Sequence, residues 1–288
     1  MREEERSPAA RARAESALVR LLHEIGDEAP FLVVLGGLVP AVLAADTPGV
    51  IPEHLGTTDI DILLVSHIDP GADLGVVERA LEALQFEPDP EQDGWRWQGT
   101  IGSTPIRIEF LCDLSQYREG ESIRPNGSCR LGAANLRGTG YVAHDFQWEN
   151  ITGALANGTE VQVSVRFAGL QGYLLSKCVA LRSRAATKDY YDLAYVLLHN
   201  RAGGPEDAAQ ALRDGPLSKD LGTLKSTFLE VRERYRNTSD IGPRSYAEQA
   251  IQVDPQTPET ELRADAVDTV QRFITALGFA DAPRGQLD

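Results

Sequence analysis

The sequence predicts an α+β protein, in which a small mixed sheet flanked by helices is followed by a helical domain. Before residue 167, apolar and polar residues alternate in several short runs, which is typical of strands. After residue 167, apolar residues recur at helical spacing instead. A chain of 288 residues is long enough for one large or two small domains. We therefore expect a first domain over residues 1–167 and a helical domain over residues 168–288.

The first domain is expected to begin with an amphipathic helix over 8–26, because Leu18, Leu21, Leu22 and Ile25 recur at helical spacing. The pattern then predicts strands at 31–35, 59–65, 94–101, 104–114, 139–148 and 159–167, with helices at 38–45 and 76–86. The polar, glycine-rich segment 115–140 is expected to form a long loop. In the second domain, helices are expected at 168–184, 187–200, 205–213, 218–235, 244–251 and 258–277.

The composition limits which cellular compartments and which binding partners are to be expected for the chain. The net charge of −15 counts against broad, non-specific nucleic-acid binding, although it leaves room for a local basic channel. The three cysteines lack metal-type spacing and cannot all pair, which fits a reducing cytoplasm. No apolar run approaches the ~20 residues that cross a bilayer, and the charged N-terminus lacks a signal core. We expect a cytoplasmic protein without membrane contacts.

A Gly-Gly pair and a nearby pair of aspartates form the most informative pattern. Gly36 and Gly37 follow an apolar run, and Asp59 and Asp61 stand at the head of the second strand. Residues i and i+2 of a strand point the same way, so the two carboxylates share a face and repel each other unless a cation lies between them. Free N–H groups at the start of a helix suit phosphate. Metal beside phosphate is the chemistry of phosphoryl and nucleotidyl transfer.

A pair of metal ions needs a third carboxylate, preferably from a neighbouring strand. Glu109 is the best candidate, because it lies in the middle of an alternating run and shares a face with Arg107. Asp113 is the second choice. The alternative for an isolated Asp-x-Asp pair is that both acids simply face solvent at a strand end.

A second group of charged residues lies in the helical half. Lys177 and Arg184 are seven residues apart, and Asp189 and Asp192 are three apart, so each pair shares a helix face. A lysine aimed at a metal centre would neutralise a triphosphate, and an aspartate would orient that lysine or a base. The alternative is a solvated helix face with ordinary salt bridges.

In this order, the motifs resemble those of the AbiEii-type nucleotidyltransferase toxin family, which includes the MenT toxins. The resemblance covers about residues 30–200 and rests on GGLVPAVL (36–43), TTDID (57–61), SK (176–177) and KDYYDL (188–193). It implies a polymerase-β-like nucleotidyltransferase domain, with an active site in the cleft that the helical domain completes. Leu38 stands where the family usually has a small hydroxyl residue, Thr57 replaces a serine, and an arginine before that motif is missing.

The resemblance also implies roles for individual residues. Gly36, Gly37 and Thr57 would hold the nucleotide, and Lys177 would contact its phosphates. Asp59 and Asp61 would bind Mg²⁺ or Mn²⁺, and Asp189 belongs to the fourth motif of the catalytic site. Glu109, chosen from the strand pattern, is expected to be the third metal ligand.

The expected reaction moves a nucleoside monophosphate from an NTP to an acceptor and releases pyrophosphate. The resemblance suggests a tRNA 3′ end as acceptor, and a toxin of a toxin–antitoxin or phage-defence pair with a cognate antitoxin protein. Candidate RNA contacts are Arg107, Arg182, Arg184 and Lys188. Two alternatives stay open: transfer to a small molecule, as in aminoglycoside-modifying nucleotidyltransferases, or a catalytically weak binding protein that keeps the fold.

Overall fold

The computed structural model describes residues 6–26, 31–45, 51–65, 74–101, 104–125, 127–184 and 186–279. The chain divides into two compact units, the first comprising Met1–Val42 with His54–Ser176, and the second Leu43–Glu53 with Lys177–Asp288. The domain break expected at residue 167 precedes helix α4 (Leu170–Ser183), whereas the division between the units falls inside this helix, after Ser176.

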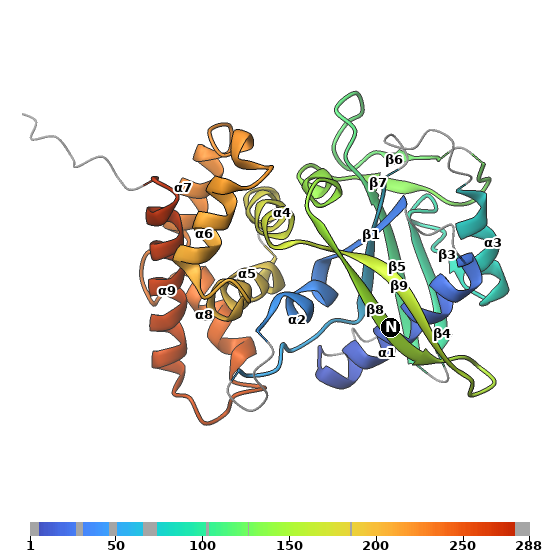
Figure 1. Ribbon diagram of the computed structural model, residues 1–288, viewed down its shortest axis with the longest axis horizontal. Helices are drawn as coiled ribbons and strands as arrows, with labels where there is room; N and C mark the ends of the chain where they lie inside the picture. Colours follow the sequence, from blue (N-terminus) through green and yellow to red (C-terminus); the bar gives the residue numbers. More distant parts are fainter. Residues whose placement is uncertain are drawn as a thin grey trace, which may run out of the picture. The chain divides into compact units, whose positions relative to one another are not determined.

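The first unit is built on a mixed β-sheet (Figure 1). Its strands in the described residues are β1 Leu32–Leu35, β2 Asp59–Leu64, β3 Glu87–Pro88, β4 Arg96–Ile101, β5 Thr104–Cys112, β6 Ser122–Ile123, β7 Ala133–Asn135, β8 Phe146–Ala154 and β9 Glu160–Ala168. The main path runs β3-β4-β5-β2-β1-β9-β8. Strand β7 pairs in parallel with the end of β5, and β6 pairs antiparallel with β7. The predicted α+β class with a mixed sheet is confirmed.

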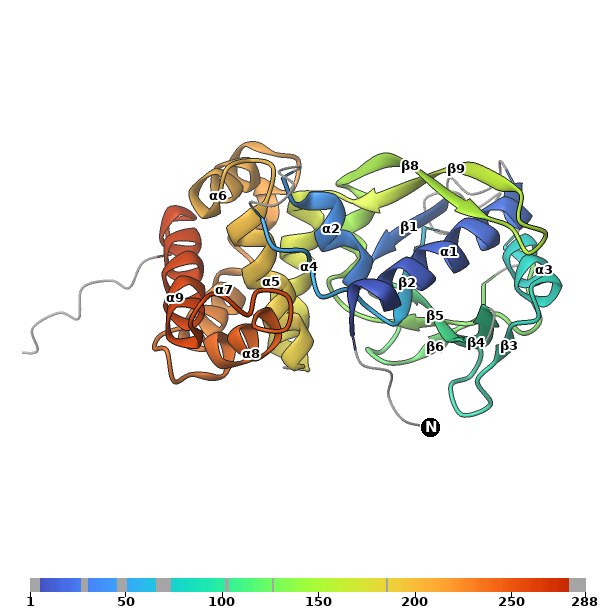
Figure 2. The same ribbon diagram turned by 90° about the horizontal axis from the view of Figure 1, so that it is seen from below.

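One face of the sheet is covered by helix α1 (Pro8–Ile25), as Figure 2 shows, and helix α3 (Gly75–Ala83) packs against α1. Helix α1 begins where the Ser7 side chain accepts a hydrogen bond from the backbone N–H of Ala10, and its apolar stripe is buried. Ile60 and Ile62 of β2 are fully buried, whereas Asp59 and Asp61 alternate with them and keep part of their surface exposed. The alternation therefore sends both aspartates to the other face of the strand.

The second unit is helical. After α4 come α5 Thr187–His199, α6 Pro205–Asp214, the 3₁₀ turn η4 Ser218–Asp220, α7 Lys225–Glu233, α8 Ile241–Ala250 and α9 Glu259–Ala276. Helix α5 packs against α8 and α9, and α6, α7 and α8 each pack against α9 (Figure 1). Fully buried aromatic side chains, among them Tyr190 and Phe273, fill this core. No helix in the described part of the chain combines the length and apolarity needed to cross a membrane.

Two expected elements differ from the structure. The strand expected at 139–148 is replaced by the 3₁₀ helix η3 (Thr139–Ala143), and β8 begins only at Phe146. Gly138 with φ +85° leads into η3, and the Asp113 carboxylate accepts hydrogen bonds from the backbone of this turn. A distant side chain therefore overrides the local strand pattern. The helix expected at 218–235 is interrupted, so that only η4 and α7 are helical.

A third expected element, the helix at 38–45, is shorter than expected: it begins as the 3₁₀ turn η2 (Gly36–Leu38), followed by α2 (Val39–Leu43). Three short strands lie outside the expected pattern. Strands β3, β6 and β7 contain two or three residues each, which is too short for an alternating pattern to be read.

Candidate functional site

The Gly-Gly pair lies directly against the Asp-x-Asp strand. Strands β1 and β2 are antiparallel, with Leu35 opposite Asp61. Gly36 follows with φ +73°, a conformation that side chains disfavour. A Cβ atom placed on Gly36 would lie 1.8 Å from Oδ2 of Asp61. The Asp61 carboxylate therefore occupies the space that any other residue at position 36 would need.

Gly37 makes a similar approach to the residue that precedes the aspartates. A Cβ atom on Gly37 would lie 2.6 Å from the Cβ of Thr57. Thr57 is 4% exposed, and its hydroxyl oxygen accepts a hydrogen bond from the backbone N–H of Asp59 at 3.2 Å. His54, in the segment before it, is fully buried, and its Nδ1 accepts a hydrogen bond from the Gly56 N–H at 3.1 Å. His54 therefore supports the loop from inside rather than facing solvent.

The third predicted carboxylate stands beside the first two. Strands β2 and β5 are parallel neighbours, with Asp59 opposite Arg107 and Asp61 opposite Glu109. Side chains opposite each other on paired strands point to the same face. The register thus brings Asp59, Asp61 and Glu109 to one face of the sheet, at the Gly36–Asp61 contact.

Arginines neutralise part of this acidic face. Both Nε and Nη2 of Arg96 on β4 lie within 2.9 Å of Oε1 of Glu109, and Nε of Arg107 lies 3.6 Å from Oδ1 of Asp59. With the side chains in these positions, no group of three or more His, Cys, Asp or Glu side chains among the described residues is close enough to hold a metal ion. A cation at this face would therefore require Glu109 to turn away from Arg96.

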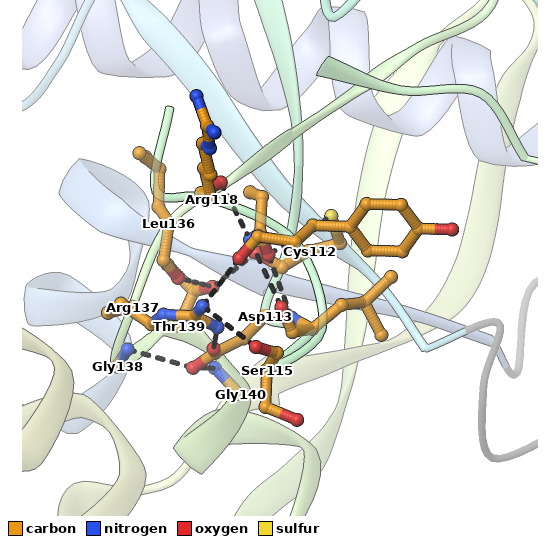
Figure 3. A network of polar contacts seen from close by, with 12 residues as sticks. Cys112, Asp113, Ser115, Arg118, Leu136, Arg137, Gly138, Thr139 and Gly140 are labelled. Atoms are coloured by element: carbon orange, nitrogen blue, oxygen red, sulfur yellow. Dashed lines mark hydrogen bonds and ion pairs between the residues drawn. The ribbon is translucent and has the colours of Figure 1, made fainter. Parts of the chain in front are cut away.

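Asp113, the second choice for the third acid, is used elsewhere. Its carboxylate accepts hydrogen bonds from the N–H groups of Gly138 and Gly140, at 2.8 and 3.2 Å, and lies 3.3 Å from Nη1 of Arg137 (Figure 3). Asp113 thereby anchors the turn that leads into η3. Between the two candidates, the structure favours Glu109, which alone lies in register with Asp61.

The long loop after β5 is organised by a buried asparagine. The Asn135 side chain is fully buried, and its amide donates to the carbonyl oxygens of Leu114, Tyr117 and Arg118 at 3.0–3.2 Å. Its oxygen accepts from the N–H of Leu114 at 2.7 Å. A single polar side chain thus satisfies several backbone groups that helices or strands would otherwise satisfy.

Lys177 lies in a buried network of charges in the second unit. Its ammonium nitrogen is 2.8 Å from Oδ1 of Asp189 and 2.7 Å from Oδ2 of Asp192, and the lysine is only 5% exposed. Nε and Nη2 of Arg184 bind both oxygens of Asp189, at 2.8 and 3.1 Å. Asp189 and Asp192 are almost completely buried, so this is not the solvated helix face of the alternative interpretation.

The charges of this network stabilise one another. Burial alone would raise the pKa of Asp189, but the positive charges of Lys177 and Arg184 outweigh it and hold this pKa below its usual value. For Lys177, burial alone would lower the pKa, but Asp189 and Asp192 outweigh it and raise this pKa. Lys177 and Asp189 are therefore both charged at neutral pH.

The predicted residues thus fall into two groups. Gly36, Gly37, Thr57, Asp59, Asp61 and Glu109 come together in the first unit, and Lys177 and Asp189 are bonded to each other in the second. The sequence reasoning missed Arg96 as the partner of Glu109. Arg96 lies in the expected strand 94–101, which pairs antiparallel with the strand of Glu109 and places the two residues opposite each other. The pairing of these two strands could therefore have indicated this partner.

Two of the three cysteines are buried. Burial, and then the neighbouring Asp113 charge, raises the pKa of Cys112 to about 12, and burial raises the pKa of Cys178 to about 12. Cys129 is exposed. The two buried thiols are therefore protonated and unreactive at neutral pH.

Comparisons with models of protein families, with curated proteins and with solved structures give no match to this chain.

Proposed function

We propose that this protein is a metal-dependent nucleotidyltransferase with a polymerase-β-like catalytic domain, which moves a nucleoside monophosphate from an NTP to an acceptor. The observation that carries the proposal is the approach of Gly36 to Asp61. This approach brings the Gly-Gly and Asp-x-Asp motifs, which are more than 20 positions apart in the sequence, into one place in the fold. There the backbone of Gly36 lies against the carboxylate of Asp61. Two purely solvent-facing aspartates would not need a glycine packed against one of them.

The donor set fits a hard divalent cation. Carboxylate oxygens are the ligands that Mg²⁺ and Mn²⁺ prefer, and Asp61 and Glu109 stand in register on neighbouring strands. When bound, the cation would align the acceptor oxygen with the α-phosphate and neutralise developing charge. Without a cation, Arg96 forms an ion pair with Glu109 and so reduces the repulsion between the carboxylates on this face.

The chain's own groups would do the remaining work. The backbone N–H groups of Gly36 and Gly37, at the start of the helical turn after β1, would donate to phosphate oxygens. One carboxylate of the Asp59–Asp61 pair would accept the proton of the acceptor hydroxyl. The phosphate contact predicted for Lys177 stays a prediction, and it would require the lysine to leave two buried carboxylates.

For the acceptor, we propose a tRNA 3′ end, and for the biological role a toxin controlled by an antitoxin protein, both on the basis of the motif resemblance. One observation favours a small-molecule acceptor instead. Three of the cations expected to contact RNA are paired with carboxylates: Arg107 with Asp59, Arg182 with Glu230, and Arg184 with Asp189.

Label transfer tests the proposal. The full-length protein is incubated with each α-³²P-labelled NTP, Mg²⁺ or Mn²⁺, and either total tRNA or a set of small amino sugars. Label on RNA supports the tRNA proposal, and label on a small molecule supports the alternative. Asp59→Asn should abolish either reaction, whereas Glu160→Gln, at an exposed position of β9, should not. If no acceptor is labelled, the protein is a binding protein that keeps the fold, and the enzymatic proposal fails.

A further inference from the structure

The second unit contains a cavity of about 200 Å³ that the proposed reaction does not use. We propose that this cavity binds a small organic cation, with an alkylammonium head group seated among three tyrosines and three carboxylates. The tyrosines are Tyr191 and Tyr195 of α5 and Tyr246 of α8. The inference is independent of the proposed function, because every lining residue belongs to the second unit.

The aromatic part of the lining forms a continuous cluster. The Tyr191 and Tyr246 rings are stacked with centroids 5.7 Å apart, and the Tyr191 and Tyr195 centroids are 5.9 Å apart. Tyr195 is further held by its hydroxyl, which donates to the Pro52 carbonyl oxygen at 2.9 Å. Electron-rich faces of tyrosine attract alkylammonium groups, and clusters of aromatic rings bind such groups in many proteins.

The charges around the cavity have one sign. Asp254, Glu261 and Asp265 line it, and no lysine or arginine is found among its described lining residues. His199 also lines it, but burial lowers the pKa of this imidazole to about 4, so it is neutral at pH 7. A net negative lining with neutral aromatic walls selects for cations over anions and over neutral ligands of equal shape.

Tyr246 adds a hydroxyl group to the lining of the cavity. The residue as a whole is 4% exposed. Burial, and then the charges of Asp265, Tyr195 and Asp254, raise the pKa of this hydroxyl, so it stays protonated. This hydroxyl lines the cavity together with the three carboxylates, which indicates a ligand that combines a cation with a hydrogen-bonding group.

The volume limits the size of the ligand. Drug-sized ligands need cavities of roughly 300 Å³ or more, whereas about 200 Å³ accommodates a head group and a short tail. Choline, which carries a quaternary ammonium and one hydroxyl, is a suitable probe of this chemistry.

Saturation-transfer NMR on the full-length protein tests the inference, with choline as the probe and 3,3-dimethylbutan-1-ol as its neutral isostere. We expect choline to bind about fivefold or more tightly than the isostere, because only choline gains from the carboxylates and the ring faces. Equal affinity for the two probes, or no transfer to choline at about 10 mM, would overturn the inference.

Two substitutions locate the binding. Asp265→Asn at the exposed rim of the cavity should weaken choline binding about fivefold without unfolding the protein, and Tyr246→Phe should weaken it by removing one hydrogen bond. Glu248→Gln removes the same charge from an exposed position of α8 that does not line the cavity, and should leave binding unchanged. If Asp265→Asn and Glu248→Gln affect choline binding equally, the cavity is not the binding site.

Discussion

Replacing Lys177 by methionine should strongly destabilise the protein. Methionine keeps the length and the apolar stem of the side chain but removes the ammonium that lies 2.8 Å from Asp189 and 2.7 Å from Asp192. Both carboxylates are at most 1% exposed, so water cannot replace the lost charge. Asp189 keeps its two contacts with Arg184, and Asp192 loses the ion pair with the lysine.

The size of the effect follows from the burial. Removing one partner of a buried ion pair costs about 3–5 kcal/mol, because it leaves a charge uncompensated in the interior. The remaining Arg184 contact places the expected loss near the lower limit, at about 3 kcal/mol. For a protein of this size, such a loss lowers Tm by roughly 6–12 °C.

Urea and thermal unfolding at pH 7 measure this loss, with Lys219→Met at an exposed position as the control that changes the same charge. The double variant Lys177→Met with Asp192→Asn should be more stable than the single variant, because the amide removes the charge that the lysine ammonium had balanced. If Lys177→Met unfolds within about 1 kcal/mol of the wild type, the buried network does not have the stabilising role assigned to it.

The effect should also depend on pH. Because the folded protein lowers the pKa of Asp189, this stabilisation is complete above the unfolded value of about 3.9 and is lost as the pH falls through the folded value. Because the folded protein raises the pKa of Lys177, its contribution is complete below about 10.4 and is lost as the pH rises through the folded value. The difference between wild type and Lys177→Met should therefore be largest between these limits and shrink in acid.

Three further results are expected. Gly36→Ala should cost more stability than Gly158→Ala in denaturant unfolding, because both glycines have positive φ but only Gly36 lies against a carboxylate; equal losses would mean that the close approach is unimportant. Asn135→Ala should lower the free energy of unfolding by about 2–3 kcal/mol, since buried carbonyl groups lose their donor, and a change below about 0.5 kcal/mol would contradict this role. Iodoacetamide should modify Cys129 alone in the native protein, and mass spectrometry that finds a second modified cysteine would contradict the assigned burial.

Much of the fold could be predicted from local pattern. The helix at the N-terminus, strand 59–65 and, apart from the interrupted 218–235, the helices that follow residue 167 are expected and found within a few residues, because their apolar faces repeat with a clear period. The segment 115–148 could not be predicted, because its structure depends on Asn135 and Asp113, whose partners lie far along the chain. Tertiary hydrogen bonds of this kind leave no periodic signal.

Part of the candidate site could likewise be predicted from the sequence, and part could not. The spacing of Asp59 and Asp61 and the alternation around Glu109 are sufficient to place three carboxylates on one sheet face, once β2 and β5 are neighbours. The burial of Lys177 was not predictable, because helical spacing gives the face of a residue but not what covers that face. The tyrosine cavity was missed for a related reason, since its walls come from separate helices.

The corner formed by Gly36 and Asp61 is proposed to bind a nucleotide and a metal ion. The most direct test of this proposal is calorimetric titration of the protein with each of the four NTPs, with and without Mg²⁺, for the wild type, Asp61→Asn and the control Glu160→Gln. At least one NTP should bind only with Mg²⁺. Asp61→Asn should weaken this binding at least about tenfold, equivalent to about 1.4 kcal/mol, while Glu160→Gln should leave it intact. Binding of no NTP in the presence of Mg²⁺, or equal binding by wild type and Asp61→Asn, would contradict the proposal.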